Sequence, residues 1–350
     1  MSDIPLDHLP MRPSTVSLFH QRGFLTINEI EEAKSRGGIS NLAEELQLSL
    51  TQTAALVREL NSASNSMKRQ NITALSLLQA RKKMSIITFS KSIDNILGGG
   101  ISLGELTEVC GLPGAGKTQL GMQLCVNTNL PQEFGGVCGQ SIYIDTEGSF
   151  SPERCYSMAH ALVQHVDRSS KNKKLPEWFE ADSILDGIQV FRVYDEASQV
   201  SVLQSLQQYI EKFQQTSRPI RLILLDSIAF HYRSATSDYL GRTKSLSDTA
   251  SFLIDLATKN DLAAVVINQM TTKLSGDSSQ VVPALGESWA HAVTTRLILT
   301  TTCPPIRTCR LVKSPHKACA VAHCEIRECG IRDMVQSQED QERKRQRVNL

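Results

Sequence analysis

Apolar residues follow two different patterns along this chain of 350 residues, and the change between them predicts its organisation. From Leu18 to about Leu60 they recur at the spacing of amphipathic helices. The apolar stripes are formed by Leu42, Leu46, Leu50, Ala54, Val57 and Leu60. Ser40 and Thr51 are candidate N-caps of these helices. The pattern predicts a small all-helical N-terminal domain over residues 1–65.

From residue 86 to about 335 short apolar runs alternate with helical patterns. The runs do not alternate with polar residues, which is typical of a parallel sheet covered on both faces. They are Ser141–Ile144, Ile188–Val190, Leu222–Leu225 and Ala263–Ile267, and Leu106–Cys110 is also predicted to be a strand. Leu297–Thr302, Arg310–Val312 and Ala318–Ile326 predict an antiparallel extension of the sheet. The predicted fold class is therefore α/β, with a mainly parallel central sheet over residues 86–335.

Two polar segments flank this α/β region. The stretch Asn61–Gln70 predicts a linker, which we place at residues 66–85. The linker contains the apolar segment Ala74–Leu78, and we expect this segment to dock on a partner. Residues 336–350 predict a basic, disordered tail. Its cations fit a nuclear import signal or, alternatively, a solvated charge run; they are Arg343, Lys344, Arg345 and Arg347.

Composition limits the classes of function. The formal net charge is +1, so any contact with nucleic acid must come from local basic loops. The nine cysteines have no disulfide-framework spacing and indicate reduced thiols in an intracellular protein. The N-terminal residues do not resemble a secretory signal, and we find no apolar stretch long enough to span a membrane. We expect a soluble protein with no membrane partner.

Residues 111–118 spell the nucleotide-triphosphate signature G-x-x-x-x-G-K-[ST] between an apolar run and the helical pattern Gln119–Asn127. Its backbone is expected to cradle phosphate oxygens, Lys117 to meet the β- and γ-phosphates, and Thr118 to bind Mg²⁺. The remaining members of the loop are Gly111, Leu112, Pro113, Gly114, Ala115 and Gly116. A glycine-rich turn without a ligand is the alternative, and the strand-to-helix context favours nucleotide binding.

Three polar residues follow predicted strands, where ligands of parallel sheets bind. Asp226 is expected to hold Mg²⁺ through water beside Thr118. Glu147 could accept a proton from the attacking water, or could merely cap the helix near Pro152. Gln269 could contact the γ-phosphate or its water, or could be a satisfied amide at a strand end.

In order and spacing, these motifs resemble the ATPase core of the eukaryotic RecA-like recombinases from about Ile86 to Asp333. The matching segments are residues 111–118, 143–150, 225–227, 268–273 and 291–297. Within that family the sequence is most similar to the C-type paralogue of homologous-recombination repair. The supporting segments are Ile93–Gly100, Val282–Trp289, Lys313–Pro315 and the basic tail.

The resemblance implies ATP and Mg²⁺ as cofactors, Glu147 as the catalytic carboxylate and Gln269 as a switch amide. It also implies that His291 senses the γ-phosphate of a neighbouring subunit, whereas the residue alone would suggest a core histidine. Lys313 is a second candidate to meet a neighbour's nucleotide.

The resemblance also implies two DNA-facing loops, one after Asp226 and one after Gln269. The second is a long polar loop over residues 271–283. Their candidate DNA-binding cations are Arg233, Arg242, Lys244 and Lys273.

One feature departs from the filament-forming recombinase. Where that family carries a phenylalanine-x-x-alanine plug, this chain has Asn71-Ile72-Thr73-Ala74. Replacing a buried aromatic by Asn weakens self-assembly and favours pairing with other subunits.

We therefore expect a nuclear DNA-dependent ATPase paralogue, with some cytoplasmic pool and weak hydrolysis alone. Its expected partners are single-stranded and branched DNA, other RecA-like recombinase paralogues and the main recombinase. The alternatives are a strand-exchange recombinase in its own right and an ATP-binding adaptor without significant hydrolysis.

Overall fold

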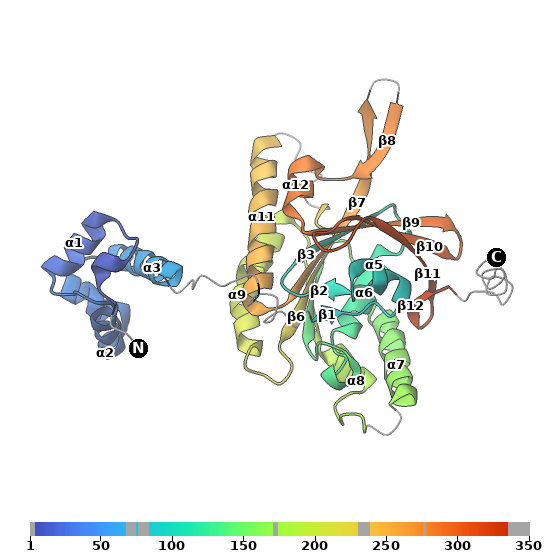
Figure 1. Cartoon of the computed structure of the whole chain (residues 1–350), viewed down its shortest axis with the longest axis horizontal. Coiled ribbons are helices and arrows are strands. Elements are labelled where there is room, and N and C mark those ends of the chain that lie inside the picture. The colour runs from blue at the N-terminus through green and yellow to red at the C-terminus, as the bar shows by residue number, and fades with distance from the viewer. Residues whose placement is uncertain are drawn as a thin grey trace. The chain divides into compact units, whose positions relative to one another are not determined.

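The computed structural model describes residues 4–67, 75, 84–170, 174–229, 239–275 and 278–334, except for the side chains at 62, 64–67, 239–243, 274–275 and 278. The chain divides into two compact units, Met1–Lys82 and Lys83–Leu350 (Figure 1). Each has its own core and is described by itself.

The first unit is helical. Its elements are the 3₁₀-helix Leu6–His8 and the helices α1 (Pro13–Gln21), α2 (Ile27–Leu46) and α3 (Leu50–Met67). Phe19, Leu42, Leu46 and Leu60 are buried in one cluster, as the helical periodicity predicts. Leu50 departs from the stripe, because it lies at the start of α3 and is exposed.

The helix ends of this unit differ from the prediction. Thr26 and Glu29 form a capping box at the start of α2, and Ser49 and Gln52 exchange hydrogen bonds at the start of α3. The predicted cap Thr51 therefore lies inside α3. The backbone of α2 is not helical at Gly37 and Gly38, and Ser40 lies just after this kink, inside the second helical part. The linker prediction also begins too early, because α3 continues through Met67 and buries Ala63 in the core.

The second unit is built on one twisted sheet with the strand order β12-β11-β10-β9-β3-β7-β6-β4-β5. Strands β9, β3, β7, β6, β4 and β5 are mutually parallel, whereas β10, β11 and β12 are antiparallel. Their bounds are β3 (Leu106–Gly111), β4 (Gln140–Asp145), β5 (Ile188–Arg192), β6 (Ile220–Asp226), β7 (Ala263–Ser275), β9 (Thr295–Cys303), β10 (Ile306–Lys313), β11 (Ala320–Arg327) and β12 (Gly330–Asp333). The predicted mainly parallel α/β fold is confirmed. The exception is β9, which was expected in the antiparallel extension but pairs in parallel with β3.

Helices cover both faces of the sheet (Figure 1). One face packs against α5 (Lys91–Leu97), α6 (Lys117–Asn127), α7 (Pro152–Ser169) and α8 (Ala181–Asp186). The other packs against α9 (Glu196–Phe213), α11 (Tyr239–Asn260) and α12 (Gly286–Ala292). Within β4, Tyr143 belongs to the first cluster, and Ile142 and Ile144 belong to the second. This burial on both sides explains the unbroken apolar runs.

The segment predicted as a long polar loop after Gln269 is a β-hairpin. Strand β7 continues to Ser275 and pairs antiparallel with β8 (Ser278–Pro283), from Met270 opposite Pro283 to Ser275 opposite Ser278. The short strands β1 (Ser85–Ile86) and β2 (Ile101–Ser102) form a separate pair. In the part of the chain that the structure describes, no helix has both the length and the apolar character to cross a membrane.

Candidate nucleotide site

The phosphate-loop signature forms the turn between β3, which ends at Gly111, and α6, which begins at Lys117. Gly114 (φ 75°) and Gly116 (φ 101°) adopt left-handed backbone conformations that favour glycine. A Cβ added at Gly111 would lie 2.6 Å from the carbonyl oxygen of Leu299, so the backbones of β3 and β9 could not approach as closely. The glycines are therefore required by the shape of the turn.

Lys117 projects from the first turn of α6, where backbone N–H groups have no intrahelical acceptor. Its Nζ donates to the carbonyl oxygen of Leu112, 3.1 Å away across the loop. Burial lowers the pKa of Lys117, and the negative charges of Asp226 and Glu147 oppose that shift. The ammonium group thus lies against the loop and within the electrostatic influence of two carboxylates.

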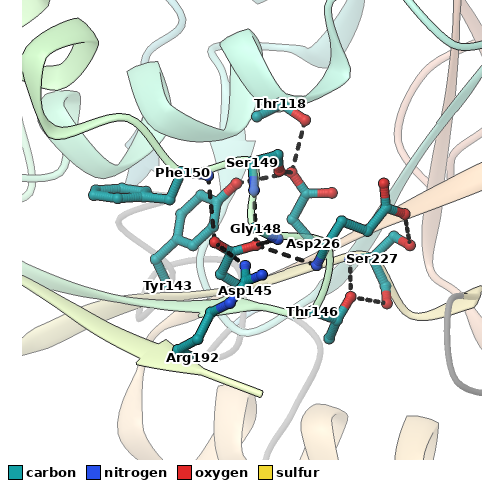
Figure 2. A network of polar contacts seen from close by, with 11 residues as sticks. Thr118, Tyr143, Asp145, Thr146, Gly148, Ser149, Phe150, Arg192, Asp226 and Ser227 are labelled. Atoms are coloured by element: carbon teal, nitrogen blue, oxygen red, sulfur yellow. Dashed lines mark hydrogen bonds and ion pairs between the residues drawn. The ribbon is translucent and has the colours of Figure 1, made fainter. Parts of the chain in front are cut away.

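Asp226 lies at the end of β6, and one of its carboxylate oxygens accepts hydrogen bonds from three hydroxyl groups (Figure 2). Its Oδ2 accepts hydrogen bonds from Thr118 Oγ1 (2.8 Å), Tyr143 OH (2.7 Å) and Ser149 Oγ (3.5 Å). Burial raises the pKa of Asp226, and the bonds from Tyr143 and Thr118 oppose the rise. The structure therefore brings together Thr118 and Asp226, the pair predicted to hold Mg²⁺.

Glu147 follows β4 and is exposed. Its Oε1 accepts hydrogen bonds from Ser227 Oγ (2.5 Å) and Gln269 Nε2 (2.7 Å), although Gln269 is 122 positions away in the sequence. Thr146 and Ser227 also exchange hydrogen bonds, at 2.7 and 3.0 Å, which ties the end of β4 to the end of β6. Glu147 is thus not a helix cap, since Ser151 caps α7.

A buried carboxylate that the sequence analysis did not single out holds this loop. Asp145 Oδ1 accepts from the backbone N–H groups of residues 147, 148 and 149, at 3.2, 2.8 and 3.2 Å. Its Oδ2 accepts from Phe150 N (3.3 Å) and pairs with Arg192 at 2.7 Å (Figure 2). A Cβ added at Gly148 would lie 2.1 Å from Arg192 Nη2, so the loop is packed against this guanidinium.

Arg154 is a second residue that the sequence analysis missed. Its Nε donates to Gln119 Oε1 (2.6 Å) in α6, and its other guanidinium nitrogens donate to the carbonyl oxygens of Arg327 and Glu328. It therefore joins α6, α7 and the β11–β12 turn beside the phosphate loop. The sequence offers one weak signal of this joining role. Arg154 lies two residues after Pro152, in the first turn of a helix that follows the Glu147 loop.

The two residues predicted to reach a neighbouring subunit lie around α12. His291 is exposed near the end of this helix. Lys313 Nζ donates to the carbonyl oxygens of Ala290 (2.9 Å), His291 (3.0 Å) and Val293 (2.6 Å). The ammonium group is thus used within its own subunit, and its role across an interface stays a prediction.

The predicted DNA-binding residues are described only in part. Lys244 is exposed on α11, and Lys273 on the hairpin lies 3.9 Å from Glu287. Arg242 belongs to α11, but its side chain is outside the described atoms. Arg233, the segment Asn71–Ala74 and the basic tail lie outside the described residues, as does all of Ala74–Leu78 except Leu75, which is 62% exposed.

The described residues fit a nucleoside triphosphate with Mg²⁺. The glycine turn has no room for a Cβ at Gly111, and it leads into the N-terminus of α6, which favours phosphate binding. The Lys117 ammonium group lies beside this turn. The hydroxyl of Thr118 and the carboxylate of Asp226 are hard oxygen donors, which Mg²⁺ prefers.

Sequence comparison shows to which class of protein this site belongs. The Rad51 family profile matches residues 79–334, which includes nearly all of the α/β unit. The chain therefore belongs to the Rad51 family, and it is a RecA-like recombinase paralogue of the eukaryotic kind.

The relatives agree with this assignment. The chain is 35% identical over 336 residues to a DNA repair protein RAD51 homolog 3 from Cricetulus griseus, covering 93% of this chain and 90% of the relative. It is 40% identical over 282 residues to a protein of the same name from Dictyostelium discoideum, covering 79% and 73%. It is 30% identical over 320 residues to a DNA repair and recombination protein RadA from Metallosphaera sedula, covering 89% and 90%.

Proposed function

We propose that this protein is an ATP-dependent, DNA-binding paralogue that acts in homologous-recombination repair of DNA double-strand breaks. The observation that carries the proposal is the hydrogen bond of 2.7 Å between Glu147 and Gln269 at the edge of the sheet where the phosphate loop lies. This bond joins a carboxylate that could act as a base to an amide that could act as a switch, and the chain belongs to the Rad51 family, so both observations support the proposal. The names of the relatives support the repair role.

At the nucleotide, the loop backbone of residues 111–116 and the ammonium group of Lys117 bind the phosphates. Thr118 and Asp226 are the residues that would hold Mg²⁺, which would neutralise charge on the phosphate oxygens. Glu147 accepts a proton from the attacking water. Ser227 and Gln269 orient the Glu147 carboxylate through the bonds described above.

The proposal is tested first by calorimetric titration with ATP and Mg²⁺. Lys117→Ala is expected to lose most nucleotide affinity, because the phosphate charge then lacks its nearest cation. Lys212→Ala, an exposed lysine on α9, is the matched control and is expected to bind as the wild type does. Equal affinity of Lys117→Ala and wild type would contradict the site.

DNA binding is assigned to Arg233, to Arg242 and Lys244, which lie on α11 rather than in the predicted loop, and to Lys273 on the β7–β8 hairpin. Basic side chains that contact phosphates make affinity depend on salt. Arg233→Ala and Arg242→Ala are each expected to reduce the salt-dependence slope for single-stranded DNA by roughly 0.7. Identical slopes in these variants, wild type and Lys212→Ala would count against the contacts.

The paralogue role is assistance to the main recombinase during its assembly on single-stranded DNA, within a heteromeric complex. Asn71 at the plug position and the exposed Leu75 support pairing with other RecA-like subunits. His291 and Lys313 are the residues proposed to face a neighbour's nucleotide.

The site of action is the nucleus, with some cytoplasmic pool, and the import signal is Arg343, Lys344, Arg345 and Arg347. Deletion of the residues after Val335 should shift the protein toward the cytoplasm and spare ATP hydrolysis. Unchanged nuclear localisation of the truncated chain, expressed without partners, would rule the tail out as the signal.

A further inference from the structure

A buried carboxylate lies in the middle of the central strand β3, three residues before Gly111. The side chain of Glu108 is fully buried. Its Oε1 accepts hydrogen bonds from Asn268 Nδ2 (2.6 Å) and Trp289 Nε1 (2.8 Å), and its Oε2 pairs with Arg296 Nε. We call these four residues the Glu108 network. Even a paired charge in an apolar sheet core contributes little stability compared with apolar packing, which points to a role beyond packing.

The first arm of the network reaches Gln269. Asn268 Oδ1 accepts from the backbone N–H of Gln269 (2.8 Å), while Asn268 Nδ2 also donates to Ala284 O (2.9 Å). Ala284 N in turn donates to Gln269 O at 2.9 Å. Asn268 therefore joins Glu108 to the switch amide and to the base of the β7–β8 hairpin.

The second arm reaches α12 and β9. Trp289 is buried and lies two residues before His291 on α12. Arg296 lies at the start of β9, and its side chain is only 12% exposed. Lys313 donates to carbonyl groups at the C-terminal end of α12, as described above. The helix is therefore held at this end by Lys313 and in its middle by the bond from Trp289 to Glu108.

We propose that Glu108 is a positioning residue that couples Gln269 to α12 and to the hairpin base. The inference rests on the proposed function, because it assumes that the Gln269 amide changes partner when nucleotide binds. That amide now donates to Glu147. When the Gln269 side chain changes partner, the backbone at Gln269 shifts with it, and its N–H group donates to Asn268. Short, charge-assisted bonds then pass this shift through Glu108 to Trp289.

A purely structural role is the competing interpretation. In that case the Glu108–Arg296 pair only fixes β9 against β3, and the surroundings of Trp289 do not depend on nucleotide. The two interpretations differ in the response of Trp289, and the chain is suited to measuring it. Its two tryptophans are Trp289 and Trp178, and the latter packs on Arg218 (4.3 Å) and Phe179, away from the network.

The test uses the full chain carrying Trp178→Phe, so that Trp289 is the sole indole. Its emission is followed during titration with Mg²⁺ and a non-hydrolysable ATP analogue, and calorimetry measures binding in parallel. We expect the emission to change and to saturate with the calorimetric Kd. Asn268→Leu in the same background is expected to lose most of that change while the calorimetric Kd stays close to that of the parent.

Asn127→Leu is the matched control, because Asn127 is also a buried amide but donates to Ile87 O (2.7 Å), outside the network. It is expected to keep the full emission change. Asn268→Ser replaces Asn268→Leu if the larger side chain prevents folding.

Two results would contradict the proposed coupling and leave the proposed function standing. One is an unchanged Trp289 emission in the parent although calorimetry shows binding. The other is a full emission change in the Asn268 variant. Absence of nucleotide binding in the parent would contradict the proposed function itself, and the coupling with it.

Discussion

Asp145 places the candidate catalytic loop although it is not itself the proposed base. Its two oxygens receive four backbone N–H groups of the segment that carries Glu147, and Arg192 neutralises its buried charge. The same guanidinium lies 5.6 Å from the ring of Tyr194. The direction of the Glu147 carboxylate therefore depends on a residue that we do not place in contact with nucleotide.

Replacement of Asp145 by alanine should lower the rate of ATP turnover without lowering the affinity for nucleotide. We expect Asp145→Ala to lower ATP turnover by roughly ten- to a hundredfold, because a misplaced base loses alignment with the attacking water. Nucleotide affinity should change little, since the phosphate loop is untouched. Steady-state phosphate release and calorimetry measure the two quantities. Asp182→Ala, at an exposed carboxylate on α8, is the control, and a wild-type rate in Asp145→Ala would refute the positioning role.

At the scale of elements, the start of the α/β unit contains a half-buried carboxylate that makes stability depend on pH. Asp94 on α5 accepts hydrogen bonds from Thr88 N and Thr88 Oγ1, both at 2.8 Å. Burial raises the pKa of Asp94 to about 6, with a smaller contribution from the charge of Asp333, and the Thr88 bonds oppose the rise.

The sign of this effect follows from proton binding. The unfolded chain releases the Asp94 proton near the ordinary value of 3.8, whereas the folded chain holds it up to about 6. Between these values the folded state binds more protons, so the Asp94 contribution to the free energy of unfolding falls as pH rises and stays low above pH 6.

Asp94→Asn should therefore stabilise the protein at neutral pH by about 2 kcal/mol. The gain should shrink as pH is lowered through the folded-state pKa. Denaturant unfolding at several pH values measures the difference. Asp255→Asn, at an exposed carboxylate, is expected to show no such trend, and a pH-independent difference for Asp94→Asn would contradict the assignment.

The elements also show how far sequence reasoning reaches. The phosphate-loop turn was predicted correctly because its glycines, strand and helix are contiguous, and local preference and tertiary structure agree there. The β7–β8 hairpin was missed because its polar sequence lacks a strand signature, and its base is fixed by contacts between Ala284 and Gln269. The Glu108 network joins residues 160 to 188 positions apart, so no local pattern could indicate it.

At the scale of the whole molecule, each of the two units has its own apolar core, and the first unit carries an exposed leucine, Leu75, after α3. Leu75 is 62% exposed, and an apolar side chain exposed in this way is a candidate contact for another subunit. We interpret it as part of the surface that pairs with another RecA-like paralogue.

Leu75→Asp should weaken this pairing. We expect co-expression with a RecA-like paralogue to raise the melting temperature and ATP turnover of the wild-type chain, because a partner that binds only the folded state stabilises it. Leu75→Asp should lose most of both gains. Leu25→Asp, at a leucine 56% exposed in the first unit, should keep them. A monodisperse, fully active monomer, indifferent to partner and substitution, would overturn this interpretation.

DNA-stimulated phosphate release tests the central claim most directly. The wild-type protein, Glu147→Gln and the exposed-site control Glu211→Gln are assayed with ATP and Mg²⁺, with and without single-stranded DNA. We predict that DNA accelerates release by the wild type and the control. Glu147→Gln should bind ATP but release phosphate at least about a hundredfold more slowly, because the proton acceptor is gone. Equal rates in wild type and Glu147→Gln, with no response to DNA, would contradict the account.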